Sequence, residues 1–319
     1  ERQPTAIRYP AAGTNNALVS LHVIHVIDSA QVAITWDVES FPYLTTVEWI
    51  DDDSLLLSVC ARDQQTIVVL RASASDGTTT ELWRDSNNTW VDLVSGSPAL
   101  TKSAQLVVVA DRDDVKRILV DGNAVTPTSL NVRSLVSVSD EAIVFMANEI
   151  THPEAVSAWK WTPSSVEVLT PLDGNHSIAI GGPTTVIRRA SINLVRATTT
   201  VSTTLHGAPT THIIESFSEE ALVQPNVQFI RAGKRQIPCA LILPRDIKPG
   251  TKLPVLMDPY GGPHAQRVVD SYTAHCTSQW FADHHRRQLS QFRRRHSGGG
   301  SVHGEHAAGY RHRHCHHCA

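Results

Sequence analysis

The sequence has 319 residues, of which 41% are hydrophobic and 18% charged, and its formal net charge at pH 7 is −3. This length suits one large domain or two ordinary domains with sizeable cores. The slightly acidic balance argues against nucleic acid as a partner of the whole chain. No run of about 18 apolar residues occurs, so no membrane span is predicted.

The chain begins at Glu1 without a charged and then apolar leader, which we expect if a leader was removed or if the sequence starts inside a longer protein. Its five cysteines are few and scattered: Cys60, Cys239, Cys276, Cys315 and Cys318. Such usage predicts no disulfide framework. It favours a cytoplasmic location, with an exported parent protein as the alternative.

Residues 1–220 are rich in Thr, Val, Ser and Ile, and short strand-like runs recur, among them VSLHVIHVI, LLLSVCA, QLVVVA and AIVFMA. Helical periodicity is nearly absent from this region. Runs of this length and composition, bounded by turn residues, are typical of β-strands. The region is therefore predicted to be almost wholly β.

Turn signals recur between these runs at nearly equal spacing. Asp76-Gly77, Asp121-Gly122 and Asp173-Gly174 lie 45 and 52 residues apart, and Asp28-Ser29 and His206-Gly207 extend the series. Asp-Gly favours a two-residue hairpin because the turn needs positive φ. One such turn every 45–50 residues, with about four strands between turns, is the period of a β-propeller blade. We expect about five blades in an incomplete ring. A β-sandwich, the alternative, should show hairpins more often.

Residues 221–283 change in character. NVQFIRAGKRQIPCALILPRD predicts a hairpin with its turn at Ala232-Gly233. LPVLMDPY, residues 253–260, is a near-continuous apolar run, typical of a strand covered on both faces. The segment after it places Val268, Tyr272, Cys276 and Trp280 four residues apart, on one stripe of a helix. Strand, turn and helix in this order predict the opening of an α/β domain.

Residues 284–319 contain one Leu, one Val and no Ile. A segment of this composition cannot bury a core, so we predict a disordered tail. The abrupt change after WFAD is what a reading-frame shift would produce. The alternative is a metal site in RHRHCHHCA. That alternative is disfavoured because the ligands are crowded and no second half-site follows at finger spacing; no metal or other cofactor is predicted.

LPVLMDPYGGPHAQ followed by SQWFAD resembles the entry into the hydrolase domain of the prolyl oligopeptidase family of serine peptidases. The dipeptidyl peptidase IV branch fits best, because RYPAAGTNNALVSLHV (residues 8–23) is similar to a Tyr-Pro-x-Ala-Gly-x-x-Asn stretch in the propeller of that branch. The resemblance covers residues 5–283. It implies an incomplete propeller over residues 1–220, the start of an α/β-hydrolase domain over 221–283, and a peptide substrate between the two.

The resemblance also implies that Tyr260 contributes to the oxyanion hole. A phenol at the carboxyl end of a strand can donate a hydrogen bond to the oxyanion that develops during acyl transfer. Gly261 and Gly262 would let the backbone pass close to the substrate. The alternative is that Tyr260 only packs against the propeller. The Glu219-Glu220 pair is expected to form a solvated turn, and no substrate-binding role is transferred to it.

The sequence contains no Gly-x-Ser-x-Gly nucleophile elbow. The nucleophile, acid and histidine of a catalytic triad are therefore missing, and the chain alone is expected to be inactive. The predicted function is that of a serine dipeptidyl aminopeptidase that releases Xaa-Pro or Xaa-Ala dipeptides, present here as a truncated chain. A related oligopeptidase or acylaminoacyl peptidase and a non-catalytic propeller that acts as a binding module are the alternatives. A homo-oligomeric parent stays open.

Overall fold

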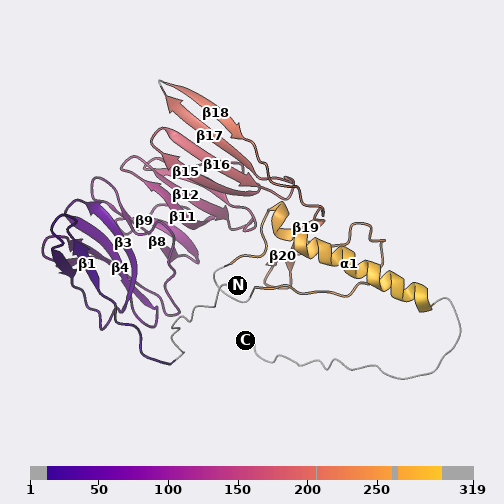
Figure 1. Ribbon diagram of the computed structural model, residues 1–319, viewed down its shortest axis with the longest axis horizontal. Coiled ribbons are helices and arrows are strands. Elements are labelled where there is room, and N and C mark those ends of the chain that lie inside the picture. Colours follow the sequence, from indigo (N-terminus) through magenta and orange to yellow (C-terminus); the bar gives the residue numbers. More distant parts are fainter. Residues whose placement is uncertain (1–12, 206, 261–264, 297–319) are drawn as a thin grey trace.

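The computed structural model describes residues 13–205, 207–260 and 265–296. Four antiparallel four-stranded sheets follow one another along the chain after a two-stranded hairpin, and they stand side by side as blades (Figure 1). The fold is thus mostly β, and it is a partial β-propeller, as the sequence predicts. Of the about five blades expected, the described residues form four complete blades and one hairpin.

The strands of each sheet are consecutive in the chain. The first hairpin consists of β1 (Leu21–Ile24) and β2 (Gln31–Ile34). The first blade consists of β3 (Tyr43–Asp51), β4 (Ser54–Cys60), β5 (Thr66–Ser73) and β6 (Thr79–Ser86). The second blade consists of β7 (Ala99–Leu100), β8 (Leu106–Arg112), β9 (Val115–Val120) and β10 (Asn123–Ala124). The third blade consists of β11 (Leu130–Val138), β12 (Ile143–Glu149), β13 (Ser157–Thr162) and β14 (Ser165–Val168). The fourth blade consists of β15 (Asn175–Gly181), β16 (Thr184–Ala190), β17 (Thr198–Leu205) and β18 (Ala208–Ile214).

The hydrophobic core lies between the blades. Strand β4 is buried along its whole length, because its side chains alternate between two covered faces. Leu57 belongs to the cluster shared with the first hairpin, whereas Leu56 belongs to the cluster shared with the second blade. Strand β8 repeats the arrangement, with Val108 toward the first blade and Val109 toward the third. Covered on both faces, these strands have continuous rather than alternating apolar sequences.

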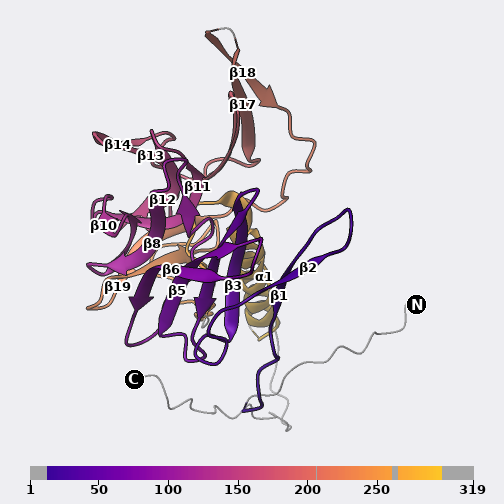
Figure 2. The ribbon, with the colours of Figure 1, turned by 90° about the vertical axis from the view of Figure 1, so that its left-hand side faces the viewer.

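The fourth blade is packed more loosely than the others. None of its described hydrophobic side chains is fully buried, and every residue of β18 is exposed. Ile213 and Ile214, at the end of β18, are 74% and 53% exposed. Strands β17 and β18 project away from the other blades (Figure 2). Within the described residues no further blade covers this face, so the stack is open at this end.

Three of the turn signals mark the third hairpin of a blade. Gly77 joins β5 to β6, Gly122 joins β9 to β10 and Gly207 joins β17 to β18, with φ values of +75°, +80° and +88°. The prediction of a hairpin at Asp173-Gly174 was wrong, because this pair lies between the third and fourth blades. There Gly174 is needed for another reason: a Cβ would lie 2.5 Å from the carbonyl oxygen of Ala190.

The segment after the blades forms the expected hairpin but not the expected strand. Strands β19 (Val227–Ala232) and β20 (Ile237–Ile242) pair antiparallel around a turn that begins at Gly233. Residues 251–260, in contrast, contain no strand, and Val255 is 82% exposed. A strand covered on both faces needs neighbours, and no described strand pairs with this run.

Helix α1 (Tyr272–His296) continues beyond the boundary drawn from the sequence. Residues 284–296 are helical, so the prediction of disorder from residue 284 was wrong for them. A helix already begun can continue through Arg, Gln and Leu without a core, because these residues have high helix propensity. The rest of the tail, including the His- and Cys-rich residues 312–318, lies outside the described residues. No helix that the structure describes has the length and apolarity required to cross a bilayer.

The buried face of α1 is more polar than predicted. Tyr272, His275 and Gln279 are buried, whereas Trp280 is 51% exposed and stacks on His284. The Gln279 side chain accepts a hydrogen bond from the backbone N–H of Asn226 at 2.6 Å and donates one to the carbonyl of Leu243 at 3.0 Å. The helix is therefore fixed to the β19–β20 hairpin largely by hydrogen bonds.

Replacement of Leu57 by Ala should destabilise the blade stack far more than replacement of Leu82, which lies in β6 of the same blade. Leu57 is fully buried and Leu82 is 39% exposed. The Leu57→Ala cavity should cost about 2–5 kcal/mol, and the Leu82→Ala change should cost well under that. Urea unfolding followed by tryptophan fluorescence measures both, and equal losses would contradict a core that lies between blades.

Candidate functional site

Tyr260 ends the irregular segment 251–260, and its side chain is 46% exposed. The residue is thus only partly covered by the described residues, and the role expected for it stays a prediction. Gly261 and Gly262, expected to approach a substrate, lie outside the described residues. The description of the site therefore rests on the residues that flank this turn.

An ion pair links the two sides of the Tyr-Gly-Gly-Pro turn. The guanidinium of Arg267 donates to a carboxylate oxygen of Asp258. Both side chains are about half exposed, so the pair alone contributes little to stability. Its effect is geometric: the residues before Tyr260 are tied to the residues after the turn.

The segment after the turn is fastened to a loop of the propeller. We call residues 150–156, between β12 and β13, the docking loop. Gln266 donates through Nε2 to the carbonyl of Pro153 in this loop at 2.6 Å. Its Oε1 accepts a hydrogen bond from Arg133 on β11. Gln266 is therefore held by one strand of the third blade, β11, and by the docking loop.

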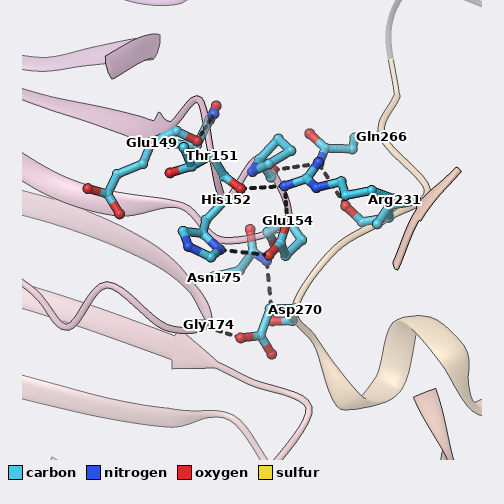
Figure 3. Close-up of polar contacts among 12 residues, drawn as sticks. Glu149, Thr151, His152, Glu154, Gly174, Asn175, Arg231, Gln266 and Asp270 are labelled. Carbon is cyan, nitrogen blue, oxygen red and sulfur yellow. Dashed lines mark hydrogen bonds and ion pairs between the residues drawn. The ribbon is translucent and has the colours of Figure 1, made fainter. Parts of the chain in front are cut away.

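The β19–β20 hairpin reaches the same docking loop (Figure 3). Arg231 on β19 donates to the carbonyl of Thr151 and lies 3.8 Å from a carboxylate oxygen of Glu154. The other oxygen of this carboxylate is 3.2 Å from Nδ1 of His152. The Glu154 side chain is only 13% exposed, so Arg231 reaches a shielded anion at the junction.

Asp270 makes several hydrogen bonds at this junction, of which those with Gly174 and Asn175 are drawn in Figure 3. Its Oδ2 accepts from the N–H of Gly174 at 2.7 Å. Its Oδ1 accepts from the N–H of Ile192 at 2.7 Å and from the hydroxyl of Ser191 at 3.2 Å. The residue is 9% exposed, and among the described residues no Lys, Arg or His forms an ion pair with it. A carboxylate shielded from water is thus stabilised by neutral donors alone.

The backbone of Asp270 is fixed as well. Its N–H donates to the carbonyl of Glu154 at 2.7 Å, and its carbonyl accepts from the side-chain amide of Asn175 at 3.2 Å. Two residues later the N–H of Tyr272 donates to the carbonyl of Ser191 at 3.2 Å. The start of α1 is thus bound both to the chain at the start of β15 and to the connection that follows β16.

A hollow of about 520 Å³ lies between the fourth blade and the start of α1. Its charged lining includes Arg188, Arg196, Glu219 and Glu220. The Glu219-Glu220 pair, expected to be a solvated turn, therefore borders a concave surface, and Glu220 lies 3.5 Å from Arg196. Burial raises the pKa of Tyr272, which also lines the hollow.

Sequence reasoning proposed Tyr260, and it missed the residues that hold the segments on either side of it. Asp270, Gln266 and Arg231 belong to no motif, and their partners lie about 80–130 residues away in the chain. The one local signal is an acidic residue two positions before Tyr272, the first residue of α1. That pattern predicts a helix start rather than a contact with a distant blade.

The class of protein follows from these observations: a partial β-propeller joined by a polar junction to a hairpin and helix. The model of the family described as the dipeptidyl peptidase IV (DPP IV) N-terminal region matches residues 1–181. This match covers more than half of the chain, so the chain belongs to this family.

Two similar proteins agree with this assignment. A probable dipeptidyl peptidase 4 of Emericella nidulans is 26% identical over 303 aligned residues, covering 82% of this chain and 38% of the relative. The crystal structure of Porphyromonas gingivalis dipeptidyl peptidase 4 has the same fold, with a TM-score of 0.65 at 18% identity. That match covers 83% of this chain and 40% of the other. The chain thus spans about two-fifths of the length of these relatives.

Gly174→Ala should be more destabilising than Gly122→Ala. The two glycines have φ values of +83° and +80°, so both substitutions cost about 1–2 kcal/mol of left-handed strain. Only at position 174 would the new Cβ collide with a backbone oxygen, whereas none lies within 4 Å at position 122. Denaturant midpoints of the two variants test this difference; equal shifts would exclude close packing at the junction.

His176 should make stability depend on pH. The ring is 7% exposed, Nδ1 lies 3.0 Å from the carbonyl of Val156, and Nε2 has no partner among the described residues. Burial, assisted by Arg189, lowers its pKa below the ordinary 6.5, while the hydrogen bond to the Val156 carbonyl and the charges of Asp173 and Asp270 oppose the change. The unfolded chain then binds the proton more readily.

The contribution of His176 to the free energy of unfolding is therefore fully present above about pH 6.5, and it is lost as the pH falls toward the lower pKa of the folded state. Urea midpoints between about pH 7.5 and 5.5 should fall less steeply for His176→Asn than for the parent chain. His212→Asn, on exposed β18, is the control. If His176→Asn left the slope unchanged, the buried ring would not be its source.

Proposed function

We propose that the chain is the propeller and the beginning of the catalytic domain of a serine peptidase that releases N-terminal dipeptides with Pro or Ala in second position. The main support is the match of residues 1–181 to the DPP IV N-terminal region. The Tyr-Gly-Gly-Pro turn that follows in the same chain adds the chemical part of the argument. The proposed partner is a peptide, and the scattered cysteines favour a cytoplasmic location.

Tyr260 has a defined task in this proposal. When a serine oxygen attacks the scissile carbonyl carbon, the carbonyl oxygen gains negative charge, and the Tyr260 hydroxyl donates a hydrogen bond to it. The 46% exposure of the side chain is compatible with such access. Tyr260 stabilises charge and cannot itself form the acyl bond. Because the sequence has no nucleophile elbow, the proposed reaction belongs to a longer protein.

The missing elbow favours a second candidate function, a propeller that binds peptides without cleaving them. The two candidates differ in the coding DNA after the codon of Asp283. If the serine peptidase proposal is right, another reading frame encodes an apolar strand and then a Gly-x-Ser-x-Gly segment. If no frame does so, the binding module becomes the better proposal.

The 319-residue chain should not hydrolyse a Gly-Pro chromogenic amide, whereas a frame-restored protein should do so and lose activity to a serine-directed inhibitor. In the restored protein Tyr260→Phe should lower kcat by about 10²–10³ with little change in KM, because the lost hydrogen bond acts in the transition state. Tyr43→Phe, on β3 of the first blade, is the matched control.

Two results would count against this proposal. Inhibitor-sensitive turnover by the 319-residue chain would show that a nucleophile is present after all. If neither protein hydrolysed the amide, the proposed peptidase activity would be refuted.

A further inference from the structure

Asp270 is a shielded anion whose stabilising groups all come from the propeller. The donors are the N–H groups of Gly174 and Ile192 and the hydroxyl of Ser191. A carboxylate out of water is costly unless such donors surround it, and hydrogen bonds to a charged acceptor are stronger than neutral ones. The carboxylate therefore holds its own segment firmly against two connections of the propeller, the one that contains Gly174 and the one that contains Ser191 and Ile192.

The arrangement joins parts of the chain that are far apart in sequence. Gly174 lies between the third and fourth blades, and Ile192 follows β16. Asp270 lies between the Tyr-Gly-Gly-Pro turn and α1, and its N–H adds a hydrogen bond to Glu154 of the docking loop. One residue thus connects three propeller segments to the start of the helix.

Described contacts lead from Asp270 back to the neighbourhood of Tyr260. Gln266 is held by Pro153 of the docking loop and by Arg133. The adjacent Arg267 pairs with Asp258, which is two residues before Tyr260. The positions on either side of the turn are thereby coupled to the surface on which Asp270 is anchored.

We propose that Asp270 is a positioning residue: it anchors the segment after the turn to the propeller, and through the Arg267–Asp258 pair it sets the location of Tyr260. This inference rests on the proposed role of Tyr260 in catalysis. The propeller then supports the oxyanion donor as well as covering the site. Asp270 itself contacts neither substrate nor reacting atoms and acts only through Tyr260.

The test uses the full 319-residue chain labelled with fluorotyrosine, because activity is not needed. The chain has five tyrosines, and Tyr260→Phe and Tyr43→Phe assign their two ¹⁹F resonances. Asp270→Ala should shift or broaden the Tyr260 resonance and leave that of Tyr43 unchanged. Amide hydrogen exchange in the first turns of α1 should become about tenfold faster or more, because the start of the helix loses the hydrogen bonds that hold Asp270 to Gly174, Ser191 and Ile192.

Two further variants sharpen the test. In Asp270→Asn the side-chain carbonyl can still accept from Ile192, but the amide group faces the N–H of Gly174, so the effects should be intermediate. Asp173→Ala removes a neighbouring exposed carboxylate that pairs with Arg189 and should leave Tyr260 unchanged.

An unchanged Tyr260 resonance in both Asp270 variants would overturn the proposal, even if α1 exchanged faster. Equal loss of protection in all blades would also overturn it, because Asp270 would then be a residue of general stability. Neither readout depends on peptide hydrolysis. Failure of the positioning role and failure of the peptidase proposal can therefore be told apart.

Discussion

The fold depends on one constraint: the middle strands of the first three blades are apolar on both faces and must be covered on both. Leu56 and Leu57 are neighbours in β4, yet they belong to different hydrophobic clusters, one on each side of the first blade. Val108 and Val109 divide in the same way. Among these three, each blade therefore completes the core of the next, as repeated units do when none can bury its apolar faces alone. The row of blades follows from this alternation.

Where the stack ends, polar interactions replace apolar ones. The fourth blade pairs its middle strands through hydroxyl contacts such as Thr184 with Thr203, and its described hydrophobic side chains are only partly buried. The contacts that join the propeller to the following segment are likewise hydrogen bonds and ion pairs, made by Asp270, Gln266 and Arg231. Polar junctions between domains depend on direction more than on area. This junction can therefore hold a particular geometry while it buries little apolar surface.

The blades could be predicted well from the sequence because a strand that is buried on both faces has a continuous apolar run, which can be recognised without knowing its neighbours. A run such as LLLSVC needs no knowledge of distant residues to be read as a covered strand. The same rule failed for LPVLMDPY, because an apolar run shows only that a strand could be covered, not that neighbours are present. The prediction at Asp173-Gly174 failed for a related reason. A glycine is required there because a Cβ would collide with the carbonyl oxygen of Ala190, and not because the chain forms a hairpin. Asp270 could not be found at all, since its partners lie far away in the chain.

These limits bear directly on Tyr260. An oxyanion donor is effective only when it is held in place before the reaction, since a donor that must reorganise loses most of its effect. A tyrosine at the end of a strand can be fixed by pairing of that strand within a sheet or by contacts of the turn that follows. In this chain residues 251–260 have no strand partner among the described residues, whereas the residues that flank the turn are bound through Asp258, Gln266 and Asp270. The propeller thus supplies one of the two supports, and sheet neighbours for residues 253–260 would have to supply the other before Tyr260 could act on an oxyanion.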